Sequence, residues 1–281
     1  MDEELQARVR AWLAYYEELG LAPFYRVRRG ASVLPSQEPA LAPQMPAAAA
    51  AAAAPPAAAA AREQAPMALS LFGEAPGRIP GDTLEKIQAD IGDCRRCKLW
   101  PHRRTIVYGE GHPRAELVFV GEAPGEEEDR QGLPFVGRAG QLLNHWIESL
   151  GLKRREVYIC NVIKCRPPGN RSPEKDEMET CSQFLFRQLD VIQPKLICCL
   201  GSVALQRLLG KNVSISRFRG QFSDYRGTKL FATFHPAYLL RNPNANREVQ
   251  QDLRTIRKFL GLPPPGGARP ARPAGRRDAR S

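Results

Sequence analysis

The chain has 281 residues, of which 41 are Lys or Arg and 30 are Asp or Glu, so its net charge at pH 7 is +11. This excess of positive charge favours a polyanionic partner, and a hydrophobic content of 43% excludes a wholly disordered chain. Seven cysteines, an odd number, argue against a disulfide framework and for thiols that are buried or bind metal in a reducing compartment.

The sequence shows no sign of membrane insertion or export. No run of residues reaches the roughly 18 apolar residues that a membrane span needs. The start of the chain, Met1 to Glu4, lacks the basic residues of a signal peptide. We therefore expect a cytoplasmic protein with no membrane contact, and we expect it to act as a monomer.

Three segments are expected to lie outside the main domain. Residues 1–30 carry apolar residues at helical spacing, which predicts a short helical segment. Residues 31–81 are rich in Ala and Pro, and Pro breaks helices while alanine buries too little area to build a core, so a disordered linker is predicted. Residues 263–281 hold five arginines against one aspartate, which indicates a disordered basic tail.

The segment 82–262 alternates short apolar runs with amphipathic helices, which is typical of a parallel sheet covered on both faces. The runs predicted to be strands are Glu116–Gly121, Val157–Ile163, Leu196–Leu200 and Lys229–Phe234. The predicted helices are Thr83–Ile91, Ala139–Leu150, Pro173–Val191, Ser202–Leu209 and Arg247–Leu260. Because ligands bind at the carboxyl ends of strands in such sheets, we expect the functional site in the loops that follow them.

A glycine-rich loop follows the first predicted strand. It reads GEAPG from Gly121 to Gly125, continues through four acids from Glu126 to Asp129, and leads to PFVG at Pro134 to Gly137. Glycines let backbone amides approach a ligand closely, but no Gly-Lys-Ser/Thr follows, which argues against a phosphate-binding loop. The four acids fit either a divalent-metal site or a solvated turn.

Polar residues also follow two other predicted strands. Asn161 is succeeded by a basic loop rich in Pro and Gly up to Arg171, and an amide offers both a donor and an acceptor, which suits the edge of a uracil or thymine ring. His235 stands at the end of the fourth predicted strand, where an imidazole can donate a hydrogen bond to charge on a leaving group. Each residue taken alone also fits a structural role.

The cysteines suggest a four-thiolate site. Cys94 and Cys97 form a pair with two residues between them, and Cys165 and Cys181 are two further thiols far along the chain. Zinc and an iron–sulfur cluster both accept four thiolates, and a redox dithiol is a third alternative, so spacing does not choose between them. The remaining cysteines lie within apolar strands, where buried core thiols are expected.

Taken in order, these blocks resemble the family 4 uracil-DNA glycosylases, the iron–sulfur members of that superfamily. The similarity spans residues 84–260, and three strand-end motifs and four cysteines coincide in register. The resemblance implies a three-layer α/β/α sandwich around a four-stranded parallel sheet. It also implies a [4Fe-4S] cluster on Cys94, Cys97, Cys165 and Cys181, and flipping of uracil out of DNA followed by hydrolysis of its N-glycosidic bond in base excision repair.

The same resemblance implies roles for residues at the uracil pocket. Phe135 would stack on the flipped uracil, Asn161 would read its pyrimidine edge, and His235 would stabilise negative charge on its O2. Glu122 and Glu128 would line the pocket as catalytic carboxylates. Gly121 and Ala123 would complete the uracil-binding loop.

Further residues are implied to contact DNA. Leu239 or Leu240 would fill the vacated stack as a wedge, with core packing as the alternative for either leucine. The residues implied to hold the DNA backbone are Arg166, Asn170, Arg171 and Arg241.

Two departures from related families bear on the mechanism. The position of Ala123 is an aspartate in the better-known uracil-DNA glycosylases, so a nearby acid such as Glu128, or the DNA phosphates, would have to assist the sugar cation. A related group that becomes covalently trapped on DNA has a histidine in the loop after the second motif, whereas this chain has Gly169 to Pro173 there. Turnover without a covalent product is therefore expected.

Alternatives to this function remain. The cluster is expected to fix the loop between Cys165 and Cys181, with electron transfer as the second possibility. A non-catalytic iron–sulfur module that binds DNA or senses redox state is the alternative function. A zinc-dependent nuclease or phosphatase would need clusters of His and Asp at the strand ends, where the sequence places only His235.

A last motif, Ala68 to Phe72, precedes the domain. It reads ALSLF and resembles the bacterial sliding-clamp-binding pentapeptide, apart from Ala68, where that motif prefers Gln. A short apolar peptide on a tether can bind a groove and deliver the enzyme to replicated DNA. The alternative is that Leu71 and Phe72 pack against the domain.

Overall fold

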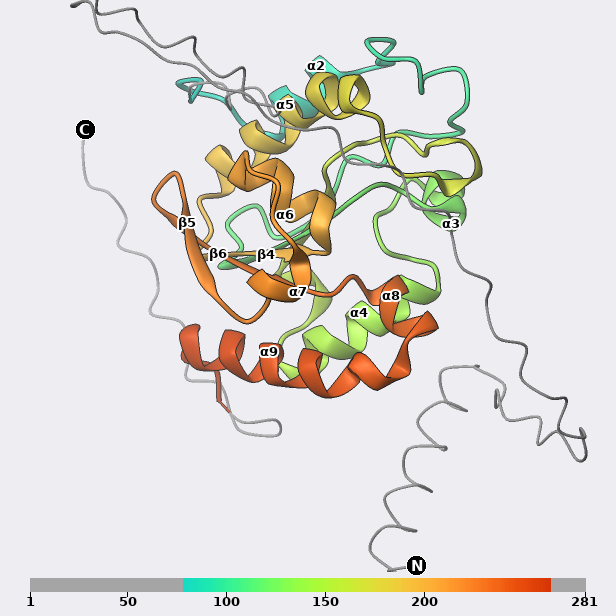
Figure 1. Cartoon of the computed structure of the whole chain (residues 1–281). Helices are drawn as coiled ribbons and strands as arrows, with labels where there is room; N and C mark the ends of the chain where they lie inside the picture. The colour runs from blue at the N-terminus through green and yellow to red at the C-terminus, as the bar shows by residue number, and fades with distance from the viewer. Residues whose placement is uncertain (1–77, 264–281) are drawn as a thin grey trace, which may run out of the picture. The chain divides into compact units, whose positions relative to one another are not determined.

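The computed structural model describes residues 78–263, which form one mixed β-sheet with helices on both faces (Figure 1). The strands are β1 Glu110–Gly111, β2 Leu117–Gly121, β3 Tyr158–Asn161, β4 Leu196–Leu200, β5 Phe222–Tyr225 and β6 Thr228–Thr233. Their order across the sheet is β1-β3-β2-β4-β6-β5. The four central strands are parallel, and β1 and β5 pair antiparallel at the two edges.

The central strands are buried on both faces, which explains their continuous apolar runs. In β2, Val118 and Val120 pack into one hydrophobic cluster, whereas Leu117 and Phe119 pack into the other. This alternation follows from the two-residue period of a strand. The sheet therefore separates two apolar layers, and each layer needs helices to cover it.

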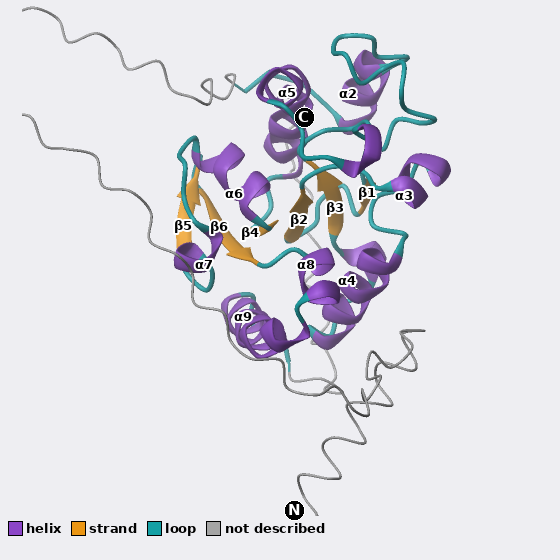
Figure 2. Ribbon diagram, turned by 45° about the vertical axis from the view of Figure 1, so that its right-hand side comes forward, coloured by secondary structure: helices purple, strands orange, loops and turns teal. Residues whose placement is uncertain are grey.

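Helices on the two faces of the sheet supply this cover (Figure 2). The α-helices are α2 Leu84–Ile91, α3 Glu126–Gln131, α4 Arg138–Ser149, α5 Lys175–Ile192, α6 Ser202–Leu209, α7 Ile215–Phe218, α8 Pro236–Arg241 and α9 Asn246–Phe259. The 3₁₀ turns are η1 Arg154–Glu156, η2 Pro168–Asn170 and η3 Pro243–Ala245. Buried residues of α2, α5 and α6 belong to one cluster, and those of α4, α8 and α9 belong to the other.

The three-layer α/β/α prediction is confirmed, with one correction to the sheet. The four predicted strands are the four central parallel strands, but the complete sheet has six strands. The edge strand β1 has only two residues, and β5 is a polar, largely exposed strand, so neither has an apolar run. A two-residue turn joins β5 to β6 with positive φ at Arg226 and Gly227, a hairpin geometry for which Asn-Gly or Asp-Gly is the usual sequence.

The predicted helices are all present, with ends that differ by at most two residues. Three short helices were not predicted. The run of acids from Glu126 is the start of α3 rather than a turn, and α8 begins directly after His235. The third, α7, has only four residues.

Some predictions concern residues that the structure does not describe. The N-terminal helical segment, the linker up to residue 77, the clamp-binding pentapeptide and the basic tail from residue 264 all lie outside the described range. Within residues 78–263, no helix is long and apolar enough to span a membrane.

Candidate active site

A cleft of about 410 Å³ opens where the loops after β2, β3 and β6 meet. It is lined by the first loop and α3, by the loop 167–172, and by residues from His235 to Arg241. The predicted site residues that line it are Glu122, Ala123, Glu128, Phe135, Asn161, Asn170, Arg171, His235 and Arg241. The loops after these three strands therefore line one cleft, as expected from the sequence.

Asn161 ends β3 and is only 1% exposed, yet its Oδ1 has no hydrogen-bond partner. An unpaired buried polar atom costs about 1–3 kcal/mol, so this oxygen can accept a hydrogen bond from a donor that enters the cleft. Gly121 pairs with Asn161 across the sheet. A Cβ at Gly121 would lie 2.4 Å from that Oδ1 and 2.5 Å from the Phe135 ring, so the approach requires glycine.

Phe135 forms an aromatic wall of the cleft. Its backbone has a φ of 51°, an unusual conformation for a residue with a bulky side chain. A Cβ at Gly140 would lie 1.9 Å from the Phe135 carbonyl oxygen, so glycine is required where α4 passes this loop. The Phe135 ring lies 5.5 Å from the His235 ring, centroid to centroid. The strained backbone thus holds an aromatic face beside the imidazole.

The carboxylate of Glu128 holds this loop in place. Its Oε1 accepts hydrogen bonds from the backbone N–H groups of Val136 and Gly137, both at 2.9 Å. Its Oε2 accepts the N–H of Gly125 at 3.1 Å, which also caps α3. Because three backbone donors use this carboxylate, its role in the structure is to position the loop that carries Phe135.

The other acids of the run also have partners, which does not fit the divalent-metal interpretation. Asp129 is 1% exposed and accepts the backbone N–H groups of Arg104 and Thr105. Glu127 pairs with Arg130, and Glu126 pairs with Arg166. In residues 78–263, no three His, Cys, Asp or Glu side chains are close enough to hold one metal ion. The acidic run is therefore structural.

Glu122 is the carboxylate of the cleft that is not consumed by backbone donors. Burial raises its pKa above the usual value, and a hydrogen bond with the Ser172 hydroxyl opposes this rise. Ala123 beside it adds no ionisable group to the cleft. The first loop therefore presents to the cleft one carboxylate, Glu122, that backbone donors do not occupy.

His235 caps α8, and this geometry fixes its protonation. The backbone N–H of Ala237 donates to Nδ1 of His235 at 3.1 Å, so Nδ1 is an acceptor and the proton of the neutral ring lies on Nε2. Burial, and secondarily the positive charge of Arg241, lower the pKa of His235 to about 4. The imidazole is therefore neutral at pH 7 and keeps one N–H donor for a ligand.

The loop after β3 is held by its own ion pairs. Arg166 donates to Oδ1 of Asn170 at 2.7 Å and pairs with Glu126 at 3.4 Å. Arg171 forms two hydrogen bonds, 2.8 and 2.6 Å long, with Glu177, which is fully buried in α5. These contacts fix the shape of the loop, while Asn170 and Arg171 still line the cleft.

The packing of α8 argues against Leu239, one of the two leucines expected to act as the wedge. Leu239 is 4% exposed and packs in the core, so it does not reach the surface as a wedge must. Leu240 is only partly buried, and Arg241 is exposed and lines the cleft. Tyr238, which was not predicted, is 38% exposed and also lines the cleft. Its position three residues after His235, one helical turn on, is the signal that could have indicated it.

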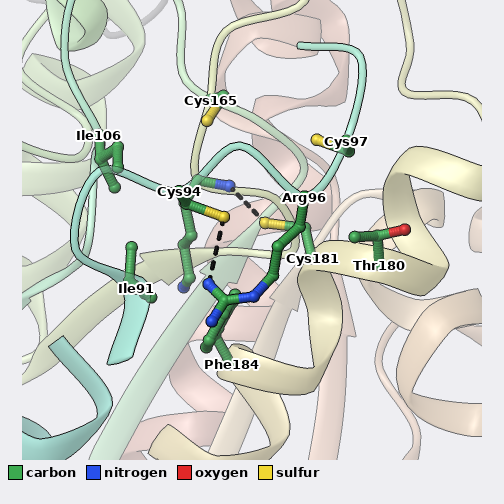
Figure 3. Close-up of a pocket in the computed structure, with 10 residues that line it drawn as sticks. Ile91, Cys94, Arg96, Cys97, Ile106, Cys165, Thr180, Cys181 and Phe184 are labelled. Carbon is green, nitrogen blue, oxygen red and sulfur yellow. Dashed lines mark hydrogen bonds between the residues drawn. The ribbon is translucent and has the colours of Figure 1, made fainter. Parts of the chain in front are cut away.

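The four predicted metal-binding cysteines line a second cavity (Figure 3). N–H groups surround their sulfur atoms. Arg96 donates to Cys94 Sγ at 3.4 Å, Arg103 to Cys165 Sγ at 3.7 Å, and the backbone amide of Lys164 to Cys181 Sγ at 3.2 Å. Such donors stabilise thiolate charge.

The acidities of these thiols argue against a reactive dithiol. Burial raises the pKa of Cys97, that of Cys165 to about 11 and that of Cys181 to about 12. A redox-active thiol needs a lowered pKa, whereas metal coordination deprotonates even a thiol of high pKa. Cys160, Cys198 and Cys199 lie buried in the strands, as expected of core thiols.

Four thiols are a donor set that both a zinc ion and an iron–sulfur cluster accept. One zinc ion needs its thiolates at about 2.3 Å from a common centre, whereas a [4Fe-4S] cluster gives each of four cysteines its own iron. The four cysteines share one cavity. The residues present thus fit an iron–sulfur cluster.

Comparison with known proteins identifies the family. The model of the uracil DNA glycosylase superfamily matches residues 108–257, more than half of the chain. The chain belongs to the uracil-DNA glycosylase superfamily. The matched range contains Phe135, Asn161 and His235, and two of the four cysteines that line the second cavity.

Individual proteins similar to this chain carry more specific names. The chain is 47% identical over 191 residues to a protein of Sulfurisphaera tokodaii named Type-4 uracil-DNA glycosylase, an alignment that covers 65% of this chain and 87% of that protein. It is 44% identical over 183 residues to a Thermotoga maritima protein of the same name, in an alignment that covers 64% of this chain and 95% of that protein. A Pyrobaculum aerophilum protein named Type-5 uracil-DNA glycosylase is 27% identical over 191 residues, in an alignment that covers 62% of this chain and 83% of that protein.

Proposed function

We propose that this chain removes uracil from DNA by hydrolysing its N-glycosidic bond, which leaves an abasic site for base excision repair. The observation that carries the proposal is the buried, unpaired Oδ1 of Asn161 in a cleft that also holds Phe135 and a neutral His235. Phosphate binding alone needs no such pocket. The relatives named Type-4 uracil-DNA glycosylase support the same function.

The pocket accounts for the recognition of uracil. The N3–H of a flipped uracil donates to Oδ1 of Asn161, and its O4 accepts from the amide nitrogen. Cytosine has an acceptor at N3 and an amino donor at C4. Its N3 would face the acceptor Oδ1 of Asn161 and its amino group would face the amide nitrogen, so neither hydrogen bond could form. Phe135 stacks on the face of the ring. The base must leave the helix to reach these groups, because a stacked base hides its glycosidic bond.

His235 assists the departure of the base. When the bond between N1 and C1′ breaks, both electrons go to uracil and negative charge develops on its O2. The Nε2–H of His235 donates a hydrogen bond to this oxygen, and the ring stays neutral because its pKa is about 4. This interaction strengthens as charge develops, so it stabilises the transition state more than the bound substrate.

Glu122 is the residue that we assign to the sugar side of the reaction. Its carboxylate lines the cleft, and it can stabilise the cationic sugar and accept a proton from the water that adds to C1′. Glu128, which sequence analysis placed beside it as a catalytic acid, acts instead through the loop that it holds. This division gives each carboxylate one role.

DNA is bound by residues around the cleft. Arg166, Asn170, Arg171 and Arg241 provide positive charge and polar groups for phosphates. Leu240 is the member of the leucine pair whose partial exposure fits a wedge. Excision then ends in turnover, because the loop from Gly169 to Pro173 offers no nucleophilic histidine to trap the sugar.

The cysteines Cys94, Cys97, Cys165 and Cys181 would hold a [4Fe-4S] cluster. Such a cluster supplies a cross-link between distant segments and can carry an electron, and excision of uracil needs only the first property. The cysteines join the loop before residue 107 to the loop after β3 and to α5. The cluster thereby fixes the loop that carries Arg166 and Asn170.

Further proposals concern the whole chain. The domain spans residues 82–262 and acts as a monomer in the cytoplasm, between a linker and a basic tail. The pentapeptide from Ala68 to Phe72 binds the sliding clamp. A peptide of residues 66–74 that shows no clamp binding by fluorescence anisotropy would contradict the last of these proposals.

Base release from defined oligonucleotides tests the function. Full-length, metal-loaded protein is incubated with labelled strands that carry one uracil, cytosine or thymine, and alkali then cleaves at abasic sites. We expect cleavage of the uracil strand alone. No cleavage of any strand by folded protein would contradict the proposal and favour the non-catalytic DNA-binding or redox-sensing alternative.

A further inference from the structure

Lys164 is a buried cation between the two sites. It is 1% exposed, and in the chain it lies three residues after Asn161 and directly before Cys165. Lysine is almost never fully buried unless its ammonium group has partners. The sequence places Lys164 in the basic loop that follows Asn161, so its burial calls for a structural role.

The ammonium group faces the uracil-reading end of β3. Its Nζ donates to the backbone carbonyl of Asn161 at 3.0 Å and to Oε1 of Gln188 at 2.6 Å. Gln188, fully buried in α5, donates in turn to the hydroxyl of Tyr158 at 3.1 Å and to the carbonyl of Tyr108 at 3.0 Å. These bonds fix the end of β3 from which the Asn161 side chain enters the cleft.

The backbone of the same residue faces the cysteines. Its amide donates to Cys181 Sγ at 3.2 Å, and the residue lines the cavity of the four thiols. A single residue therefore contacts both the metal-binding set and the strand end of the uracil pocket.

Electrostatics explain why this position is occupied by a cation. The partners of Lys164 Nζ, the carbonyl of Asn161 and the amide oxygen of Gln188, are neutral. Burying an unpaired charge is costly, and burial lowers the pKa of Lys164, whereas nearby thiolates, Cys181 among them, oppose that shift. Four thiolates in the adjoining cavity carry negative charge when they bind metal, and the ammonium group offsets that charge.

We propose that Lys164 is a positioning residue that couples the cysteine site to uracil recognition. Its backbone amide stabilises the Cys181 thiolate, and its ammonium group fixes the carbonyl of Asn161, so the loaded cysteine site holds the reading amide in place. The inference rests on the proposed function, because it assigns Asn161 to uracil. It concerns the binding of the base rather than the chemical step.

The test compares variants of the full-length, metal-loaded protein. Lys164→Met keeps the length of the side chain and removes the charge, and Lys164→Gln keeps one donor. Leu253→Ala, buried in α9 in the other hydrophobic cluster, is the control for loss of stability. Binding is measured with duplexes that carry 2′-fluoro-2′-deoxyuridine, which resists cleavage, or a tetrahydrofuran abasic site, which has no base to read.

The inference makes two quantitative predictions. Lys164→Met weakens binding of the uracil-analogue duplex about tenfold relative to the abasic duplex, as expected for the loss of one hydrogen bond to a charged group. It also lowers metal affinity about 10- to 100-fold, because it removes the positive charge beside the thiolates although the backbone amide stays in place; faster loss of visible absorbance to a chelator reports this change. Lys164→Gln lies between it and the wild type, and Leu253→Ala changes neither measurement.

A double-mutant cycle separates coupling from general damage. If Lys164 acts through Asn161, then Lys164→Met added to Asn161→Ala causes no further loss of uracil-analogue binding. Equal weakening of both duplexes, or unchanged metal retention in Lys164→Met, would overturn the inference. A wild-type protein that does not prefer the uracil analogue to thymine would instead contradict the proposed function, so the two failures are distinguishable.

Discussion

Gly121 and Asn161 face each other across β2 and β3, and a Cβ on the glycine would lie 2.4 Å from the amide oxygen that has no partner in the free protein. The same Cβ would lie 2.5 Å from the Phe135 ring. One missing methyl group thus lets the reading amide and the stacking ring approach each other.

Replacing this glycine should damage the pocket while leaving the fold intact. We expect Gly121→Ala to lower the single-turnover rate of uracil excision on the order of 100-fold, because it displaces both Asn161 and Phe135. Gly210→Ala is the matched control, since its Cβ would meet nothing within 4 Å and its φ of 63° costs only stability, about 1–2 kcal/mol. A wild-type rate in Gly121→Ala would contradict this geometry.

The pH dependence should report Glu122 rather than His235. Activity requires the ionised form of Glu122, and burial raises the pKa of this carboxyl, so kcat/KM falls as pH decreases through that raised pKa. His235 stays neutral until the pH falls to about 4, so it contributes no inflection near the usual imidazole pKa of 6.5. In Glu122→Gln the acid limb should disappear. An acid limb near pH 6.5 that persists in this variant would indicate that His235 titrates there instead.

Glu128 should matter for stability and stacking together. Glu128→Gln replaces a charged acceptor of three backbone hydrogen bonds, and we expect the free energy of unfolding to fall by about 2 kcal/mol, measured in urea. Uracil-analogue binding should weaken in parallel, because Phe135 loses its support. The neighbouring Glu127→Gln, on an exposed residue, should change stability by at most about 0.5 kcal/mol. Equal effects of the two substitutions would refute the positioning role.

The cysteines offer a direct test of the metal site. Cys181→Ser should abolish most of the visible absorbance and iron content of the purified protein, because it removes one ligand of the set. Cys198→Ser, in the buried strand β4, should keep both while it loses stability. Iron analysis and absorption spectra of the two proteins decide the matter. If both variants lose metal to the same extent, then metal binding depends on the integrity of the core and not on Cys181 as a ligand.

The sequence predicts the central sheet and its strand-end loops because burial on both faces produces continuous apolar runs. Asn161 and His235 are recognisable from the sequence because they are polar residues at or near the ends of such runs. The edge strand β5 is not, because an exposed strand has no apolar run, and its Arg226-Gly227 turn lacks the usual asparagine.

The remaining differences concern which way a side chain points. Composition does not show that Glu128 turns inward to backbone amides while Glu127 faces solvent, although a capping residue three positions after Gly125 is a readable signal. The burial of Leu239 depends on how α8 packs against the core, which follows from tertiary contacts. Lys164 resembles a surface cation until the structure places it between two sites.

The account depends most on Asn161 as the group that reads uracil, and single-turnover excision tests it directly. Metal-loaded wild type, Asn161→Ala and the stability control Leu253→Ala are compared on an oligonucleotide with one uracil. We expect excision by the wild type and the control, and a loss of about 100-fold or more in Asn161→Ala, with unchanged folding and metal content. Excision at the wild-type rate by Asn161→Ala would contradict the account.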